Sequence, residues 1–365
     1  MAPNKNFKDT VLNILEKAHF THTLQVRLDD CLIEIQTNSA RLKDKLSHYF
    51  QPFVQPKNQE CNITVKAYES QCIDPELDFI VKKPEPGKTK IKEEYCDLDT
   101  GRVVKKRLTG MLYYFNNEHC LAMGPCTENE NQVINFVNNR FIQWKLDQKC
   151  LLCHAAAVAN NGNGLVLAGF SGMGKSTLAL HLMNKDLTFI SNDRLMVKKE
   201  GSKLKMFGVA KLPRVNPGTI LNNPNLSGIL SSEDKSEFQK IDPQKIWNLE
   251  QKYDVFLDQC FGPDRFRLTS SVKALVLLNW HHVSEPLHFR KINLRERQEL
   301  LSAVMKSPGL FYVSSDPAGC LEPDKQRYLE LFSHCQVYEL SGGIDFYRAA
   351  QECYQIIRSY ETGHP

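Results

Sequence analysis

The stretch Gly169-Phe170-Ser171-Gly172-Met173-Gly174-Lys175-Ser176-Thr177 has the pattern of a phosphate-binding loop: a glycine, four variable positions, then Gly-Lys-Ser. Residues 164–168 before it are apolar, as in a buried strand, and residues 176–182 after it have helical spacing. Its glycines allow a sharp turn whose backbone N–H groups can face phosphate oxygens. The stretch therefore predicts a strand–loop–helix unit that binds a nucleotide.

Each part of this loop has an expected role. The loop amides and the positive end of the following helix would hold the phosphates. Lys175 would reach the β- and γ-phosphates, and the Ser176 hydroxyl would bind Mg²⁺. The predicted nucleotide-binding set is Gly169, Phe170, Ser171, Gly172, Met173, Gly174, Lys175, Ser176 and Thr177.

Composition limits the class of protein. The chain has 365 residues, enough for two domains, and its 42% hydrophobic and 24% charged residues are typical of a soluble globular protein. A net charge of +4 is too small to indicate a nucleic acid or a membrane surface as partner. No apolar stretch reaches the roughly 18 residues of a membrane span, and the N-terminal residues are polar. We expect a cytoplasmic protein with neither of these partners.

The twelve cysteines are scattered, many in apolar runs, and are expected to be buried thiols in a reducing compartment. Residues 150–154, Cys-Leu-Leu-Cys-His, match the attachment pattern of c-type haem. Haem attachment requires export, and a zinc site would need a second ligand pair that does not follow. We therefore expect neither group at this stretch.

Two domains are expected. Residues 1–149 form an α+β domain with alternating strands at 31–37 and 62–68, a helix at 41–50 and a polar loop or exposed hairpin at 82–107. A hairpin at 111–115 and 120–123 follows, and then a helix at 129–149 whose apolar stripe is Val133, Phe136, Val137, Phe141 and Trp144.

Residues 150–365 form the predicted α/β domain. A hairpin of strands 151–159 and 164–168 turns at residues 161–164. The other predicted elements are a strand at 187–191, a hairpin at 195–197 and 204–207, a buried strand at 272–278, and helices near 243–250, 294–306, 323–333 and 343–360.

Two side chains keep a short sequence distance from Lys175. Asp193 follows it by 18 residues, at the end of the next strand, and His154 precedes it by 21 residues, on the preceding hairpin. Acidic groups at strand ends beside such a loop bind Mg²⁺ or accept a proton. Motor-type ATPases and GTPases place their second acidic residue further away, and the chain lacks the Asn-Lys-x-Asp guanine signature. This spacing disfavours those two classes.

The stretches 153–158, 164–180, 189–194 and 211–219 together resemble the HPr kinase/phosphorylase family, and more closely the HPr-kinase-related "kinase B" proteins. Residues 30–50 also resemble the start of that group. The resemblance implies a phosphoenolpyruvate-carboxykinase-like P-loop kinase domain preceded by a smaller α+β domain. It further implies a kinase that uses ATP, or sometimes pyrophosphate, with Mg²⁺ to phosphorylate a serine of a partner protein.

The resemblance also carries roles over by position. Asp193 would take the proton of the acceptor hydroxyl, and His154 would lie beside the reacting phosphate. The family has paired aspartates where this chain has Asn192-Asp193, so the implied metal ligands are Ser176, Asn192 and Asp193. Asn192 can bind Mg²⁺ through its carbonyl but adds no charge. Thr177 stands where the family has Glu.

Arg214 is the candidate for stabilising charge on the transferred phosphoryl group, because its planar guanidinium always carries a positive charge. Lys211 is the second candidate, and an exposed loop position for Arg214 is the alternative. The cluster Trp280-His281-His282 was considered as a catalytic or metal site and disfavoured, because adjacent side chains point in different directions.

These features predict an ATP- and Mg²⁺-dependent kinase that transfers a phosphoryl group to a hydroxyl, with serine of a partner protein favoured. The alternatives are a small-molecule hydroxyl kinase and a nucleotide-binding regulatory module with reduced catalysis. The acceptor stays open, with a small carrier protein as the candidate implied by the resemblance, and residues 1–149 are the candidate partner-binding domain. Kinases of the parent family assemble into hexamers, which makes a homo-oligomer a candidate.

Overall fold

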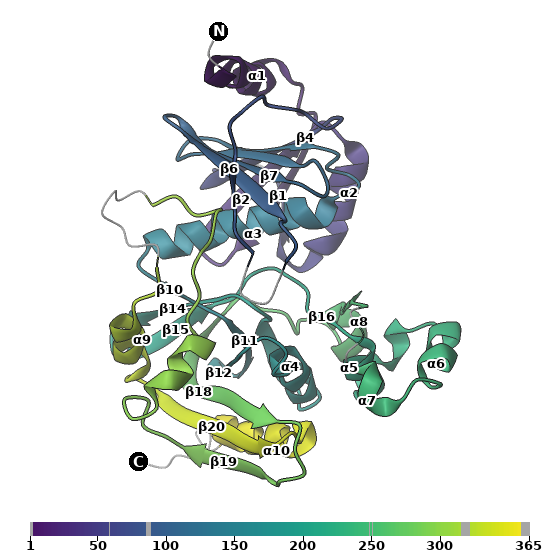
Figure 1. Ribbon diagram of the computed structural model, residues 1–365, viewed down its shortest axis with the longest axis vertical. Helices are drawn as coiled ribbons and strands as arrows, with labels where there is room; N and C mark the ends of the chain where they lie inside the picture. The colour runs from purple at the N-terminus through teal and green to yellow at the C-terminus, as the bar shows by residue number, and fades with distance from the viewer. Residues whose placement is uncertain are drawn as a thin grey trace. The chain divides into compact units, whose positions relative to one another are not determined.

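The computed structural model describes residues 3–57, 59–84, 89–247, 249, 251–314 and 322–358. Within these residues the chain has a mixed α/β structure with two sheets of nine strands each and one sheet of two strands (Figure 1). No helix in the described ranges has the length and apolar character needed to cross a bilayer.

The chain divides into two compact units. Unit 1 is Met1–Asp147 together with Pro308–Leu321, and unit 2 is Gln148–Ser307 together with Glu322–Pro365. The expected division into 1–149 and 150–365 places the boundary two residues later and leaves the segment that begins at Pro308 in the second domain.

Unit 1 contains three helices and one large sheet. The helices are α1 (Pro3–Lys17), α2 (Ala40–Tyr49) and α3 (Glu130–Asp147), with a 3₁₀ turn at Gln51–Phe53. The strands run across the sheet in the order β3 (Val54–Gln55), β1 (His22–Leu28), β2 (Cys31–Thr37), β4 (Ile63–Glu69), β9 (Cys120–Gly124), β8 (Leu112–Phe115), β7 (Gly101–Lys106), β6 (Glu93–Leu98) and β5 (Ile80–Val81).

The local patterns of this unit are confirmed. Helix α2 begins after Ser39, whose hydroxyl accepts a hydrogen bond from the Leu42 amide at 3.2 Å. The predicted stripe of α3 is buried except for Trp144, which is partly exposed and donates its indole N–H to Asp30. Hairpin β6–β7 forms within the polar stretch 82–107, but it is not an exposed hairpin, because β7 also pairs with β8 and buries Val103 and Val104. Helix α1 and strand β1 were not predicted.

Hydrogen bonds to backbone carbonyls hold the segment after Pro308 in unit 1. Arg140 and Gln143 of α3 donate to the carbonyls of Phe311 and Val313. The Phe311 ring stacks on Phe115 with ring centroids 5.7 Å apart. Because Arg140 is buried, this carbonyl satisfies a charged donor that would be costly to leave unpaired.

Unit 2 contains the second large sheet. Its strands are β10 (Leu151–Cys153), β11 (Ala155–Asn160), β12 (Asn163–Gly169), β13 (Thr188–Ser191), β14 (Leu195–Glu200), β15 (Lys203–Phe207), β18 (Thr269–His281), β19 (Leu287–Lys291) and β20 (Gln336–Gly343). The small sheet pairs β16 (Arg214–Val215) with β17 (Tyr253–Asp254). Strands β19 and β20 were not predicted.

The helices of unit 2 are mostly short. They are α4 (Lys175–Met183), α5 (Pro217–Leu221), α6 (Ser232–Phe238), α7 (Pro243–Ile246), α8 (Leu257–Phe261), α9 (Lys325–Phe332) and α10 (Phe346–Arg358), with 3₁₀ segments η2 (Pro224–Ile229) and η3 (Gln298–Ala303). Helices α9 and α10 confirm two of the predicted helices. The helix predicted at 294–306 is the shorter η3, and residues 248 and 250 of the helix predicted near 243–250 lie outside the described residues.

Strand direction in unit 2 decides which residues share an edge. Strand β18 runs parallel to both β12 and β20, and β11 runs antiparallel to both β12 and β13. The carboxyl ends of β12, β13, β18 and β20 therefore meet at the edge where β11 begins. In open α/β sheets this is the edge where ligands bind.

The predicted hairpin is formed by β11 and β12 alone. Its turn has positive φ at Asn161 (47°) and Gly162 (77°), as a two-residue hairpin turn requires. The strand predicted at 151–159 is interrupted at His154, because β10 pairs with β14 while β11 pairs with β12 and β13. His154 therefore lies at the break between two differently paired strands.

Replacing Phe311 by Ala should lower the free energy of unfolding of unit 1 by about 1–2 kcal/mol, because the ring is half-buried among aromatic side chains. Urea unfolding followed by circular dichroism would measure this. Leu108→Ala is the control, since that side chain is 60% exposed and should change the energy by less than about 0.5 kcal/mol. Equal stability of both variants would show that the segment adds nothing to unit 1.

Candidate active site

The predicted phosphate loop follows β12 and leads into α4. Gly172 and Gly174 have φ values of 83° and 78°, in the region that favours glycine. A Cβ on Gly174 would also lie 2.6 Å from the ring of Phe346, so this position excludes a side chain twice over. The loop thus has the strand–turn–helix form that a phosphate-binding loop requires.

Lys175 lies inside the turn of this loop. Its ammonium group donates to the carbonyls of Gly169 at 2.7 Å and Phe170 at 3.2 Å. Burial lowers the pKa of Lys175 to about 8, against the opposing effect of Asp193 and with a further lowering by Lys306. A bound phosphate would therefore relieve an energetic cost that the charged lysine carries in this loop.

Thr177 of the predicted nucleotide-binding set is buried and faces another element. Its hydroxyl and that of Thr219 lie 2.8 Å apart within hydrogen-bond distance. Thr219 belongs to α5, which follows residues 211–216. This contact joins the loop helix α4 to the segment that carries the predicted Arg214. By contrast, Phe170 and Ser171 of the loop are exposed.

Trp280 holds the phosphate loop through a hydrogen bond. It is fully buried at the end of β18, and its indole N–H donates to the Met173 carbonyl at 2.9 Å. Phe346 packs edge-on against it with ring centroids 5.2 Å apart. His281 and His282 are exposed. Sequence reasoning weighed this cluster as a catalytic or metal site and missed the part that Trp280 plays in holding the loop.

The strand pairing brings His154 and Asp193 together. Nε2 of His154 lies 3.1 Å from Oδ1 of Asp193, while Arg194 and Lys306 each lie 3.9 Å from Oδ2. Partial burial raises the pKa of the Asp193 carboxyl, but the hydrogen bond from His154 and the charges of Lys306, His154 and Arg194 outweigh it. The net pKa is far below the usual range, so the carboxylate is ionised at neutral pH.

The neighbouring Asn192 has an unusual side chain. Its Oδ1 is buried and has no hydrogen-bond partner in the part of the chain that the structure describes. An unpaired buried carbonyl oxygen is costly, and Mg²⁺ prefers oxygen ligands of this kind. Ser176 lies at the start of α4, after β12, and Asp193 comes just after β13. Both residues therefore follow strands that end at the same edge of the sheet. These three oxygen donors therefore fit a magnesium ion that also binds phosphate oxygens.

Within the described ranges, no group of three or more His, Cys, Asp or Glu side chains has the arrangement of a metal site. A magnesium ion here would have a single protein carboxylate, that of Asp193. The remaining ligands would be neutral protein oxygens, phosphate oxygens and water, which is a common arrangement for this ion.

The side chain of Arg214 forms an ion pair that the sequence did not predict. Its Nε lies 3.1 Å from Oδ1 of Asp254 on the paired strand β17, and its guanidinium donates to the Lys252 carbonyl at 3.5 Å. Nearly half of the side chain is exposed. The structure thus shows Arg214 in a surface ion pair rather than beside Asp193.

Lys211, the second candidate, is partly buried. Burial and the charges of Arg194 and Arg214 together lower the pKa of Lys211 to about 8. Asp193 acts in the opposite direction on this pKa, so its carboxylate lies within electrostatic reach of the Lys211 ammonium group.

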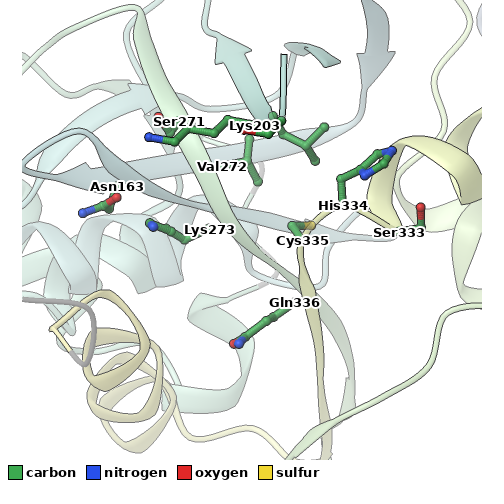
Figure 2. A pocket seen from close by; sticks show the side chains of 11 residues that line it. Asn163, Lys203, Ser271, Val272, Lys273, Ser333, His334, Cys335 and Gln336 are labelled. Atoms are coloured by element: carbon green, nitrogen blue, oxygen red, sulfur yellow. The ribbon is translucent and has the colours of Figure 1, made fainter. Parts of the chain in front are cut away.

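A cavity of about 400 Å³ lies away from this loop (Figure 2). It is lined near the amino ends of β12, β18 and β20, by Asn163, Ser271 and Gln336 among others, and therefore belongs to the opposite edge of the sheet. Figure 2 shows Lys203, Lys273 and His334 among its side chains. The phosphate loop contributes no residue to it.

No protein-family model and no curated protein sequence matches this chain. Among solved structures, the chain is similar to the HPr(Ser) kinase/phosphatase from Coxiella burnetii, with 11% identity and a TM-score of 0.28 over 57% of this chain and 95% of that one. This likeness is too distant to assign a fold family or a reaction.

Replacing Trp280 by Phe should weaken nucleotide binding about three- to tenfold, because the loop loses one buried hydrogen bond at Met173. Titration with a fluorescent ATP analogue would measure this. Trp247→Phe is the matched control, since Trp247 stacks on the same Phe346 ring. Should the Trp280 variant bind as the control does, the hydrogen bond has no part in shaping the loop.

Proposed function

We propose that this protein is an ATP- and Mg²⁺-dependent kinase that transfers the γ-phosphoryl group to a hydroxyl, favouring serine of a partner protein. One observation carries the proposal: the His154–Asp193 pair lies at the sheet edge where the phosphate loop begins. A phosphate-binding loop alone binds nucleotides. A carboxylate held beside it adds a group that can accept a proton.

The residues of the loop would bind the donor. The amides of Gly169 to Thr177 and the amino end of α4 face the phosphates, and Lys175 leaves its carbonyl partners to contact the β- and γ-phosphates. Mg²⁺, when bound by Ser176, Asn192 and Asp193, would neutralise phosphate charge. The parallel strand–loop–helix arrangement supports the expected phosphoenolpyruvate-carboxykinase-like type of P-loop kinase domain.

Asp193 would act on the acceptor. The acceptor oxygen attacks the γ-phosphorus, the bond to the β-phosphate oxygen breaks to leave ADP, and the hydroxyl proton passes to the Asp193 carboxylate. His154 holds Oδ1 of that carboxylate, so Oδ2 is the oxygen that faces the reaction. Asp193 is ionised at neutral pH, as a general base must be, while its low pKa makes it a weaker proton acceptor than an ordinary carboxylate.

A second candidate function rests on Asn192. A site with one carboxylate would bind Mg²⁺ less tightly than a site with two, which would suit a regulatory module that binds ATP without turning it over. The His154–Asp193 pair favours the kinase, since a module that only binds nucleotide has no need of it.

The acceptor and the cellular setting complete the proposal. We infer a cytoplasmic enzyme whose unit 1 binds the acceptor, with a serine of a small carrier protein favoured over a small-molecule hydroxyl. Assembly of several copies is part of this inference.

Replacing Asp193 by Asn should lower the rate of phosphoryl transfer about 10³-fold, because the general base is lost. The affinity for ATP measured without Mg²⁺ should stay within about threefold, since the loop is intact. The rate of transfer is measured as ADP produced from ATP with and without candidate acceptors. The affinity is measured by nucleotide titration. Asp258→Asn, on an exposed position, is the control. Unimpaired turnover by the Asp193 variant would remove this residue from the mechanism.

A further inference from the structure

Lys306 lies at the candidate active site although it is far from the loop in the sequence. It follows η3, and the two residues before it form backbone contacts with the chain at the break between β10 and β11. The backbone N–H of His154 donates to the Val304 carbonyl at 2.7 Å, and Met305 forms an antiparallel bridge with Cys153. The backbone that carries Lys306 is thus fixed against the backbone that carries His154.

Lys306 lies within electrostatic reach of the Asp193 carboxylate. Its Nζ is 3.9 Å from Oδ2 of Asp193, the oxygen opposite the one that His154 contacts. This distance exceeds that of a direct hydrogen bond, so the pair is electrostatic. Three quarters of the Lys306 side chain is covered, which leaves its charge less screened than that of a surface lysine.

The ammonium group of Lys306 lies on the acceptor side of the candidate site, where it faces the carboxylate of Asp193. The transferred phosphoryl group must lie between donor and acceptor, and Lys175 and Asp193 mark these two sides.

Arg214 supplies the contrast. It was the expected group for the phosphoryl charge, yet its guanidinium is paired with Asp254 and nearly half exposed. Lys306 lies 3.9 Å from Oδ2 of the Asp193 carboxylate, as the neighbouring Arg194 does. The fold thus places Lys306, and not Arg214, beside this oxygen.

We propose that Lys306 is a catalytic residue whose ammonium group contacts the transferred phosphoryl group. The inference rests on the proposed kinase function. As the bond to the β-phosphate breaks and the acceptor oxygen bonds to phosphorus, negative charge spreads over the three oxygens of the moving group. A cation fixed at that place stabilises this charge more than that of the ground state, which is what accelerates transfer.

The test compares Lys306→Met with the wild-type chain in ADP binding, with Mg²⁺ present, alone and with aluminium fluoride, which mimics the moving phosphoryl group. We expect unchanged ADP affinity, within about threefold, and a loss of about 100-fold or more in the tightening that aluminium fluoride gives. The rate at which phosphoryl transfer produces ADP from ATP should fall about 10²–10³-fold. Lys306→Arg should recover part of both, because it keeps the charge.

Lys325→Met, on an exposed position of α9, is the matched control and should behave as the wild type does. If the wild-type chain binds no ADP, the proposed function fails and the role of Lys306 fails with it. If the wild type tightens on ADP with aluminium fluoride and Lys306→Met tightens equally, only the role of Lys306 is overturned. If Lys306→Met lost the same factor of ADP affinity with and without aluminium fluoride, Lys306 would have a structural role and the catalytic role would be overturned.

Discussion

The pairing of strand β11 is the constraint on which the candidate site depends. It runs antiparallel to both of its neighbours, so its beginning lies beside the ends of β12 and β13, with Ala155 opposite Ala168 and Ala157 opposite Ser191. The phosphate loop leaves β12 at that point, and Asn192 and Asp193 leave β13 there. Because β18 runs parallel to β12, Trp280 reaches the same edge and can hold the loop.

A concentration of positive charge follows from this arrangement. Lys175, Lys211 and Lys306 all act on, or are acted on by, the single carboxylate of Asp193. Burial makes two of these lysines easier to deprotonate than a lysine in water, which shows that the site bears charge at a cost. A phosphate chain would supply the counter-charge. Asn192, next to Asp193, adds no negative charge of its own.

Sequence reasoning predicted the parts of this site that depend on local patterns. The loop is encoded by glycines and a lysine at fixed spacing, and the nearness of His154 to Asp193 follows from a hairpin and one crossover helix. The break of the strand at His154 was missed, because it results from pairing with β14 and from a bond to Val304. Lys306 was missed for the same reason: no local signal marks a residue brought in by distant backbone contacts.

Arg214 shows what local patterns leave out. An arginine can stabilise the negative charge of a phosphoryl group, but in this fold Arg214 pairs with Asp254. Asp254 lies on a short strand that was not predicted from the sequence. A residue's chemistry can be read from the sequence, whereas its partner is set by the fold.

The segment after Pro308 has a consequence for how such a chain can change over time. Since unit 1 takes one stretch from the start of the sequence and another from near its end, the polypeptide passes between the units three times. A recombination event that exchanged only the first stretch would separate Arg140 from the carbonyl that satisfies it. The pairing of α3 with the segment after Pro308 therefore depends on two stretches of sequence that lie 171 residues apart.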